Sequence, residues 1–170
     1  MSSPSIVRRA LPEDEPSIWK LFYELHAENG AFPLSVPKVQ YLLNRVLYPG
    51  RIAPGDMGPR GYMGVIGPTN NIEGFILMLI GSYWYSDMFV LEELANFVSK
   101  DHRKGTKHAE TLLKYAKHLS DKLDVPLLIG IVSTIKTEAK VRLYKRHFPL
   151  LGAFFLHNKQ MPHTANGKAA

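Results

Sequence analysis

Four basic side chains fall within the eight residues from Lys100 to Lys107, and apolar residues at helical spacing follow from Ala109 onward. This pattern predicts a basic turn at the start of a helix. Main-chain N–H groups without partners converge at a helix start, and the helix dipole favours negative charge there. The segment therefore indicates a site for a phosphate-bearing ligand such as a pyrophosphate. A solvated basic helix start is the alternative.

Two helices and a loop are expected in the first third of the chain. Residues 5–10 alternate as in a short strand, and Pro12 then opens an amphipathic helix that ends near Gly30. A second helix is expected over 35–47, with a proline in its first turn. The stretch 51–60 contains Pro–Gly and Gly–Pro pairs and is expected to be a loop.

The rest of the chain is predicted to form a sheet with crossing helices. The expected elements are strands over 62–66, 72–84 and 89–99, a helix over 109–123, a strand over 126–133, a helix over 137–146 and a strand over 152–157. The run over 126–133 is almost continuously apolar, as in a strand covered on both faces. A strand, a long helix and a buried strand in succession predict a right-handed crossover, and hence an α/β fold with a mixed sheet.

Composition limits the classes of protein that remain. With 170 residues, 45% of them hydrophobic, the chain is expected to form one domain over 1–160, followed by a flexible tail over 161–170. The net charge of +6 favours anionic partners. The absence of cysteine excludes a cysteine nucleophile. Without a long apolar run or a secretory signal, we expect a cytoplasmic protein with no membrane segment.

The order of these elements resembles the GCN5-related N-acetyltransferase (GNAT) superfamily over about residues 5–157. Members carry a Q/R-x-x-G-x-G/A turn between the fourth strand and the next helix, to which residues 103–109 correspond in two alignments. Aligned on the helix, Lys107 replaces the motif glycine; aligned on the strand, Thr106 and His108 replace both small positions. The resemblance implies a central twisted, mostly antiparallel sheet with one parallel crossover and flanking helices. It also implies acetyl-CoA as cofactor.

The same resemblance assigns residues to the cofactor. Main-chain groups of Phe97, Val98 and Ser99 correspond to those that bind the pantetheine arm. The residues that correspond to the pyrophosphate turn and helix start are Arg103, Lys104, Gly105, Thr106, Lys107, His108 and Ala109. We expect Lys104 and Lys107 to add positive charge where the family uses bare backbone.

The segment Leu143 to Arg146 resembles the family's tyrosine-bearing helix, which makes Tyr144 the candidate general acid. A phenol within hydrogen-bond reach can protonate the departing CoA thiolate. The alternative is a tyrosine packed at a helix end with its hydroxyl in water. Two departures from the family leave the local contacts open: the glycine after the tyrosine is displaced to Gly152, and no asparagine occurs in 133–136.

Two adjacent acids, Glu92 and Glu93, lie on the strand expected over 89–99. Side chains alternate along a strand, so at most one of them can face a cleft. Glu93 is the candidate general base. Pairing of either acid with a surface lysine, or deprotonation of the amine through water, is the alternative.

Three functions are compatible with these observations. The favoured one is transfer of an acetyl group from acetyl-CoA to a primary amine of a small molecule or protein; a CoA-binding regulatory domain without turnover and a basic nucleic-acid-binding module are the alternatives. Neither metal-binding histidine pairs nor hydrolase or Walker motifs occur. The acceptor pocket is expected from the loops at 31–36, 51–60 and 83–88, and a homodimer is compatible with the sequence.

Overall fold

A five-stranded mixed sheet forms the centre of the computed structural model, which describes residues 6–56, 58–131 and 137–153. The strands are β1 (Arg8–Arg9), β2 (Arg60–Ile66), β3 (Gly74–Ser82), β4 (Phe89–Val98) and β5 (Leu127–Leu128). They lie in sequence order, and each neighbouring pair is antiparallel except β4 and β5, which are parallel. The predicted α/β class, with one parallel crossover in a mostly antiparallel sheet, is confirmed.

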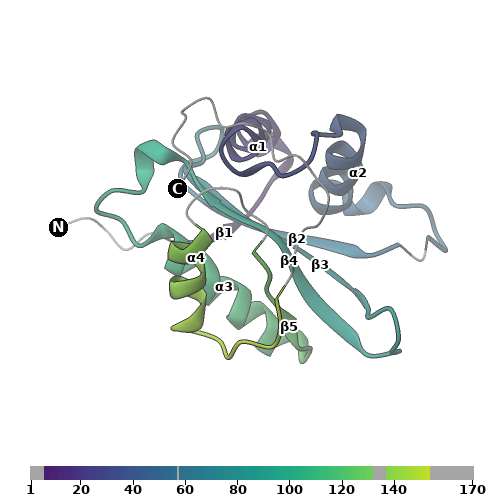
Figure 1. Ribbon diagram of the computed structural model, residues 1–170. Helices are drawn as coiled ribbons and strands as arrows, with labels where there is room; N and C mark the ends of the chain where they lie inside the picture. Colours follow the sequence, from purple (N-terminus) through teal and green to yellow (C-terminus); the bar gives the residue numbers. More distant parts are fainter. Residues whose placement is uncertain (1–5, 57, 132–136, 154–170) are drawn as a thin grey trace.

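Helices cover both faces of this sheet. They are α1 (Glu15–Asn29), α2 (Val36–Leu47), α3 (His108–Leu123) and α4 (Thr137–Lys145), and short 3-10 turns occupy Pro12–Asp14, Pro49–Arg51 and Lys100–His102. Helices α1 and α2 lie on one face, and α3 and α4 lie on the other (Figure 1). The sheet is therefore the middle layer of three, as expected when each amphipathic helix buries one side against it.

The apolar stripes predicted for the helices form the two cores. On one face, Ile18 and Phe22 of α1 are buried, and the Phe22 ring lies 4.9 Å from that of Phe75 in β3. On the other face, Leu112 and Ala116 of α3 are fully buried in the core with residues of β3 and β4. This packing fixes α3 against the sheet, and with it the basic turn that precedes the helix.

The strand predicted over 126–133 is shorter in the structure. β5 contains two residues, both half-buried, and pairs with β4 at Leu91↔Leu127 and Glu92↔Leu128. The β3–β4 register shifts just after this point, with Leu94 as the extra residue of a bulge. A bulge bends its strand, so β4 turns away from the chain that follows β5. Residues 129–131 form no regular strand, and 132–136 lie outside the described residues.

The remaining boundaries agree closely with the predicted ones. The first strand is shorter than the predicted 5–10, and the loop before β2 begins with the turn at Pro49–Arg51. The predicted last strand, 152–157, lies mostly outside the described residues, as does the predicted tail at 161–170. Within the part that is described, Gly152 and Ala153 have no regular structure.

Candidate active site

Glu93 lies at the point where β4 and β5 separate. It directly follows Glu92, the last residue of β4 that pairs with β5. Its side chain points to the α3 face, where it is only 8% exposed. Tyr144 of α4 donates a hydrogen bond from its hydroxyl to Glu93 Oε2 at 3.2 Å. The main-chain N–H of Gly130, just beyond β5, also donates to this carboxyl. The structure thus brings together the two residues predicted to carry the chemistry.

Burial sets the protonation of this pair. Loss of solvent raises the pKa of Glu93 to about 8, although Tyr144, Lys140 and the Gly130 N–H each act to lower it. The pKa of Tyr144 is also raised, first by burial and then by the neighbouring carboxylate. The phenol therefore keeps its proton at any physiological pH, whereas the carboxyl changes charge close to neutrality.

Glu92 and Glu93 point in opposite directions, as the alternation along a strand requires. Glu92 is exposed, and Glu93 is buried. The extra residue, Leu94, then changes the alternation, so that Asn96 follows Glu93 on the same face. Asn96 contacts the Tyr144 hydroxyl and also donates to the Ala109 carbonyl at 3.4 Å. The bulge therefore adds an amide beside the Glu93–Tyr144 pair.

The start of α3 has free main-chain donors. No side chain caps the helix, and within the described residues the N–H groups of His108, Ala109 and Glu110 have no acceptor. Gly105 has a positive φ of 76°, a conformation that favours glycine, and a Cβ there would meet no atom within 4 Å. Lys104 and Lys107 are exposed beside these donors. The turn fits a bound pyrophosphate through its main chain and these two lysines.

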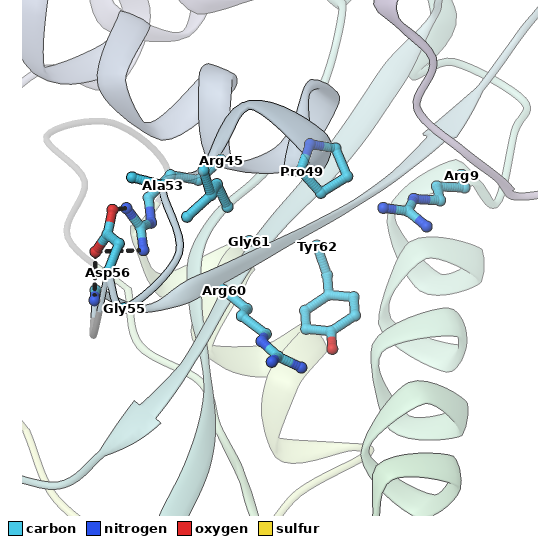
Figure 2. Close-up of a pocket in the computed structure, with 11 residues that line it drawn as sticks. Arg9, Arg45, Pro49, Ala53, Gly55, Asp56, Arg60, Gly61 and Tyr62 are labelled. Atoms are coloured by element: carbon cyan, nitrogen blue, oxygen red, sulfur yellow. Dashed lines mark hydrogen bonds and ion pairs between the residues drawn. The ribbon is translucent and has the colours of Figure 1, made fainter.

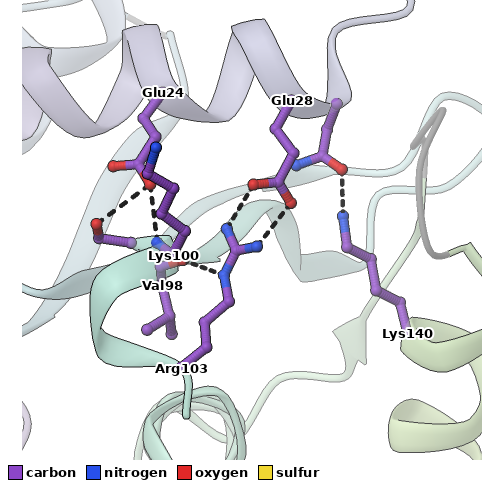
Figure 3. A network of polar contacts seen from close by, with 8 residues as sticks. Glu24, Glu28, Val98, Lys100, Arg103 and Lys140 are labelled. Carbon is purple, nitrogen blue, oxygen red and sulfur yellow. Dashed lines mark hydrogen bonds and ion pairs between the residues drawn. The ribbon is translucent and has the colours of Figure 1, made fainter. Parts of the chain in front are cut away.

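Arg103 is occupied by another partner. Its guanidinium donates two 2.8 Å hydrogen bonds to the Glu28 carboxylate of α1, and its Nε donates to the Val98 carbonyl at 2.7 Å (Figure 3). The same guanidinium lies 5.0 Å from the centre of the Phe97 ring. In this arrangement Arg103 ties α1 to the turn and is not directed at a phosphate.

The other residues assigned to the cofactor have varied surroundings. Phe97 is buried in the core on the α1 face. Ser99 donates its N–H to the Glu73 carbonyl and its hydroxyl to Glu24, so both of its donors are used. Val98, the preceding residue, therefore directs its main-chain groups away from β3. Its carbonyl already accepts from Arg103, so the Val98 N–H is the group of this segment that stays without a partner in the described residues, on the side where β5 has departed.

Two side chains of the turn are held within it. The Thr106 hydroxyl donates to the His102 carbonyl at 2.6 Å. His108 is buried, and its Nε2 lies 2.7 Å from Glu73 Oε2, while its Nδ1 has no partner in the described part of the chain. The side chains of Thr106 and His108 are thus structural here. The Thr106 N–H also donates within the turn, to the Arg103 carbonyl at 3.5 Å, whereas the His108 N–H remains available to a ligand.

Lys140 belongs to the site although the sequence reasoning missed it. Its ammonium group donates to Asn29 Oδ1 at 2.8 Å, which links α4 to the end of α1 (Figure 3). The same ammonium group lies close enough to Glu93 to favour the ionised carboxylate. The spacing contains a signal, because Lys140 and Tyr144 are four residues apart and share one helix face. Nothing in the sequence pairs either residue with Asn29, which is more than a hundred positions away.

The three loops expected to form an acceptor pocket have different environments. The loop at 51–60 lines a pocket beside β2. The tip at 83–88 joins β3 to β4 and exposes Trp84 and Tyr85, whose rings contact each other edge to face at 4.9 Å. The loop at 31–36 joins α1 to α2. Within the described residues, no group of histidines and acids could hold a metal ion, and no helix is long and apolar enough to cross a membrane.

Comparison with solved structures identifies the fold. The ribosomal-protein-alanine N-acetyltransferase of Brucella melitensis biovar Abortus 2308 aligns over 91% of this chain and 99% of its own, with a TM-score of 0.62 and 11% identity. A possible acetyltransferase of Clostridium difficile 630 aligns over 95% of this chain and 100% of its own, with a TM-score of 0.65 and 16% identity. The aminoglycoside acetyltransferase meta-AAC0020, from an uncultured soil metagenomic sample, aligns over 92% of this chain and 95% of its own, with a TM-score of 0.59 and 14% identity.

Sequence comparison alone finds no such relationship: no protein-family model and no curated protein sequence matches the chain. The structural agreement nevertheless extends over nearly the whole length of both partners in each pair. The chain therefore has the GNAT fold, as the element order predicts.

Proposed function

We propose that this protein is an acyltransferase that moves an acetyl group from acetyl-CoA to a primary amine of a small molecule or protein. The observation that carries the proposal is the pair of the buried Glu93 and the half-buried Tyr144, at the point where β4 and β5 separate in a GNAT fold. A protonated phenol and a carboxyl that titrates near pH 8 are matched to acid–base work at neutral pH.

The residues for the cofactor are the main-chain N–H groups at the start of α3, with Lys104 and Lys107 beside them. The Val98 N–H, on the side of β4 that β5 leaves free, is suited to an extended amide-bearing arm, whereas the Val98 carbonyl accepts from Arg103. Bound acetyl-CoA would supply the activated acetyl thioester. Arg103 contributes by holding the turn against α1 rather than by binding phosphate.

Glu93 and Tyr144 divide the proton transfers. The Glu93 carboxylate accepts a proton from the ammonium form of the acceptor, directly or through one water, so that the amine becomes nucleophilic. The Tyr144 hydroxyl donates a proton to the departing thiolate sulfur. Their hydrogen bond lets Tyr144 recover the proton that Glu93 accepted, and the second proton of the attacking nitrogen passes to water as the amide forms. Both groups thereby return to their starting states.

A thiol-release assay tests the proposal. Because the chain has no cysteine, a thiol reagent reports only the CoA released from acetyl-CoA in the presence of a panel of primary amines. We expect release that depends on both the amine and the enzyme. Thermal stabilisation by CoA without thiol release across the panel would instead identify a CoA-binding domain without turnover. Stabilisation by DNA or RNA, with none by CoA, would reject both readings.

A further inference from the structure

A pocket of about 470 Å³ lies at the edge of the sheet, between the start of β2 and the loop that follows α2 (Figure 2). Its volume is typical of a site for a small molecule. Three arginines and one aspartate line it, so its formal charge is positive. The pocket therefore has the size and the charge of a site for a small anion-bearing ligand.

One wall of this pocket is held by hydrogen bonds and is electrically balanced. Arg45 is 4% exposed and donates to Asp56 Oδ2 at 2.7 Å and to the Tyr41 hydroxyl at 3.0 Å. The same guanidinium donates to the Pro59 carbonyl, and the Gly58 N–H donates to Asp56. A Cβ on Gly58 would lie 2.5 Å from the Arg45 guanidinium, so the loop packs directly against this side chain. Asp56 is therefore committed to Arg45 and does not neutralise the other arginines.

The opposite wall presents unpaired donors. Arg60 and Tyr62 lie side by side on one face of β2, and Arg9 extends toward them from β1 (Figure 2). No carboxylate or carbonyl in the described residues binds the side chain of any of the three. The net positive charge of the pocket thus comes from Arg9 and Arg60, whose guanidinium groups have no ion-pair partner in the part of the chain that the structure describes.

The main chain adds another donor. β1 pairs with β2 only at Gly64 and Val65, and Ala10 donates to the Met63 carbonyl. Because main-chain groups alternate along a strand, Gly61 directs its N–H toward the same side as Met63, where β1 no longer covers the edge. The start of β2 is therefore an open edge whose N–H faces the pocket.

We propose that this pocket binds a small molecule through a phosphate or carboxylate group held by Arg9, Arg60, the Tyr62 hydroxyl and the Gly61 N–H. Guanidinium groups bind such oxyanions in a bidentate manner, which suits two arginines on neighbouring strands. The site lies at the β2 edge of the sheet, two strands away from Glu93, because Tyr62 and Glu93 pair with Met78 from its two sides.

Titration of the whole chain, followed by the arginine Nε–Hε signals in NMR spectra, tests this site. Inorganic phosphate and succinate are added in separate titrations at constant ionic strength. We expect at least one probe to shift two arginine signals saturably, and the variants Arg9→Gln and Arg60→Gln identify these signals by their loss. Each variant should weaken binding about ten-fold. Arg146→Gln removes an exposed arginine outside the pocket and should change the affinity less than two-fold.

The two probes separate the sources of the oxyanion. Saturation by phosphate alone assigns a phosphorylated ligand, saturation by succinate alone assigns a carboxylate ligand, and saturation by both assigns the shared oxyanion site. Absence of saturation with either probe would overturn the proposal. So would binding that Lys107→Ala weakens and Arg60→Gln leaves unchanged, because the anion would then lie at the start of α3.

Discussion

The β4–α3 side of the molecule and the open edge of β2 both carry arginines and a tyrosine, but their polar groups differ in what they bind. On the first side, Arg103 is held by Glu28, and Tyr144 donates to Glu93. At the edge of β2, Arg60 and its neighbour Tyr62 have no side-chain partner within the described residues. The first region is thus internally paired, and the second is directed toward solvent and a ligand.

This difference teaches that formal charge does not identify an anion site. Arg103 lies in the most motif-like segment of the chain, yet packing of α1 over the turn supplies Glu28 and consumes its guanidinium. Arg60 lies outside every motif, yet it remains available because β1 is too short to cover the start of β2. Which element packs over a charged side chain decides whether that side chain can bind a ligand.

The largest expected effect separates the two tyrosines. Tyr144→Phe removes the proton donor and should lower kcat for thiol release by about 100-fold or more, the usual range for losing a general acid. Tyr62→Phe is the matched control, because it removes the same atom from a side chain of β2, which lies two strands away from Glu93. We expect its kcat to stay within two-fold of the wild-type value.

Steady-state kinetics with acetyl-CoA and the best amine of the panel measure both variants, and CoA affinity measured by calorimetry confirms that each is folded. Full turnover by Tyr144→Phe would remove the general-acid role. An equal loss in both variants would show that the two regions act as one site.

The second effect is a pH dependence that Glu93 imposes. Its pKa is raised by burial to about 8 in the folded chain, whereas the unfolded chain has an ordinary carboxyl. The folded state therefore binds more protons between these two values, so stability is greatest below the unfolded pKa and falls as the pH rises toward 8. The slope should approach ~1.4 kcal/mol per pH unit within this window. Over the same range kcat/KM should rise, since the general base must be ionised.

Urea unfolding at a series of pH values from 5 to 9, with Glu93→Gln as the comparison, measures the slope. The glutamine variant keeps the size of the side chain and can still accept from Tyr144, and it should lose the decline in stability. An unchanged slope in Glu93→Gln would assign the decline to another group.

The third effect is smaller and concerns the start of α3. Lys107→Ala should weaken CoA about five-fold and reduce the salt dependence of binding, because an exposed ammonium group contributes ~1 kcal/mol at most. Lys114→Ala, on the exposed side of α3 and paired with Glu110, is the matched control and should leave CoA affinity unchanged. Isothermal titration at two salt concentrations distinguishes the variants. Equal affinity for Lys107→Ala and wild type would remove Lys107 from the site.

Local patterns in the sequence predicted most of the fold. The helical spacing of Leu112, Leu113 and Ala116 reports burial directly, so α3 and the turn before it could be placed. The length of β5 could not be predicted, because the apolar run after Pro126 is the same whether or not a bulge turns β4 away from it. A bulge is decided by packing between strands, which a single sequence does not record.

The sequence nominated Glu93 and Tyr144 for the candidate site but not their contact, and it did not nominate Asn96 or Lys140. Glu93 and Tyr144 are separated by about fifty positions, and only the crossover brings them within 3.2 Å. Lys140 and Asn29 were missed because their link joins helices on opposite faces of the sheet. The pocket at the edge of β2 carries no motif, since it depends on where β1 ends.

The smallest expected effect tests whether Arg103 is a structural residue of the turn. If its guanidinium serves Glu28, Arg103→Ala and Glu28→Gln should each destabilise the fold by ~0.5–1 kcal/mol, and the double variant should cost less than the sum. CoA affinity should change less for Arg103→Ala than for Lys107→Ala. If instead Arg103→Ala weakens CoA strongly, and Glu28→Gln strengthens it, the guanidinium leaves Glu28 when the cofactor binds. Arg103 would then belong, like Arg60, to the anion-binding arginines, and the contrast between the two regions would describe the unliganded chain alone.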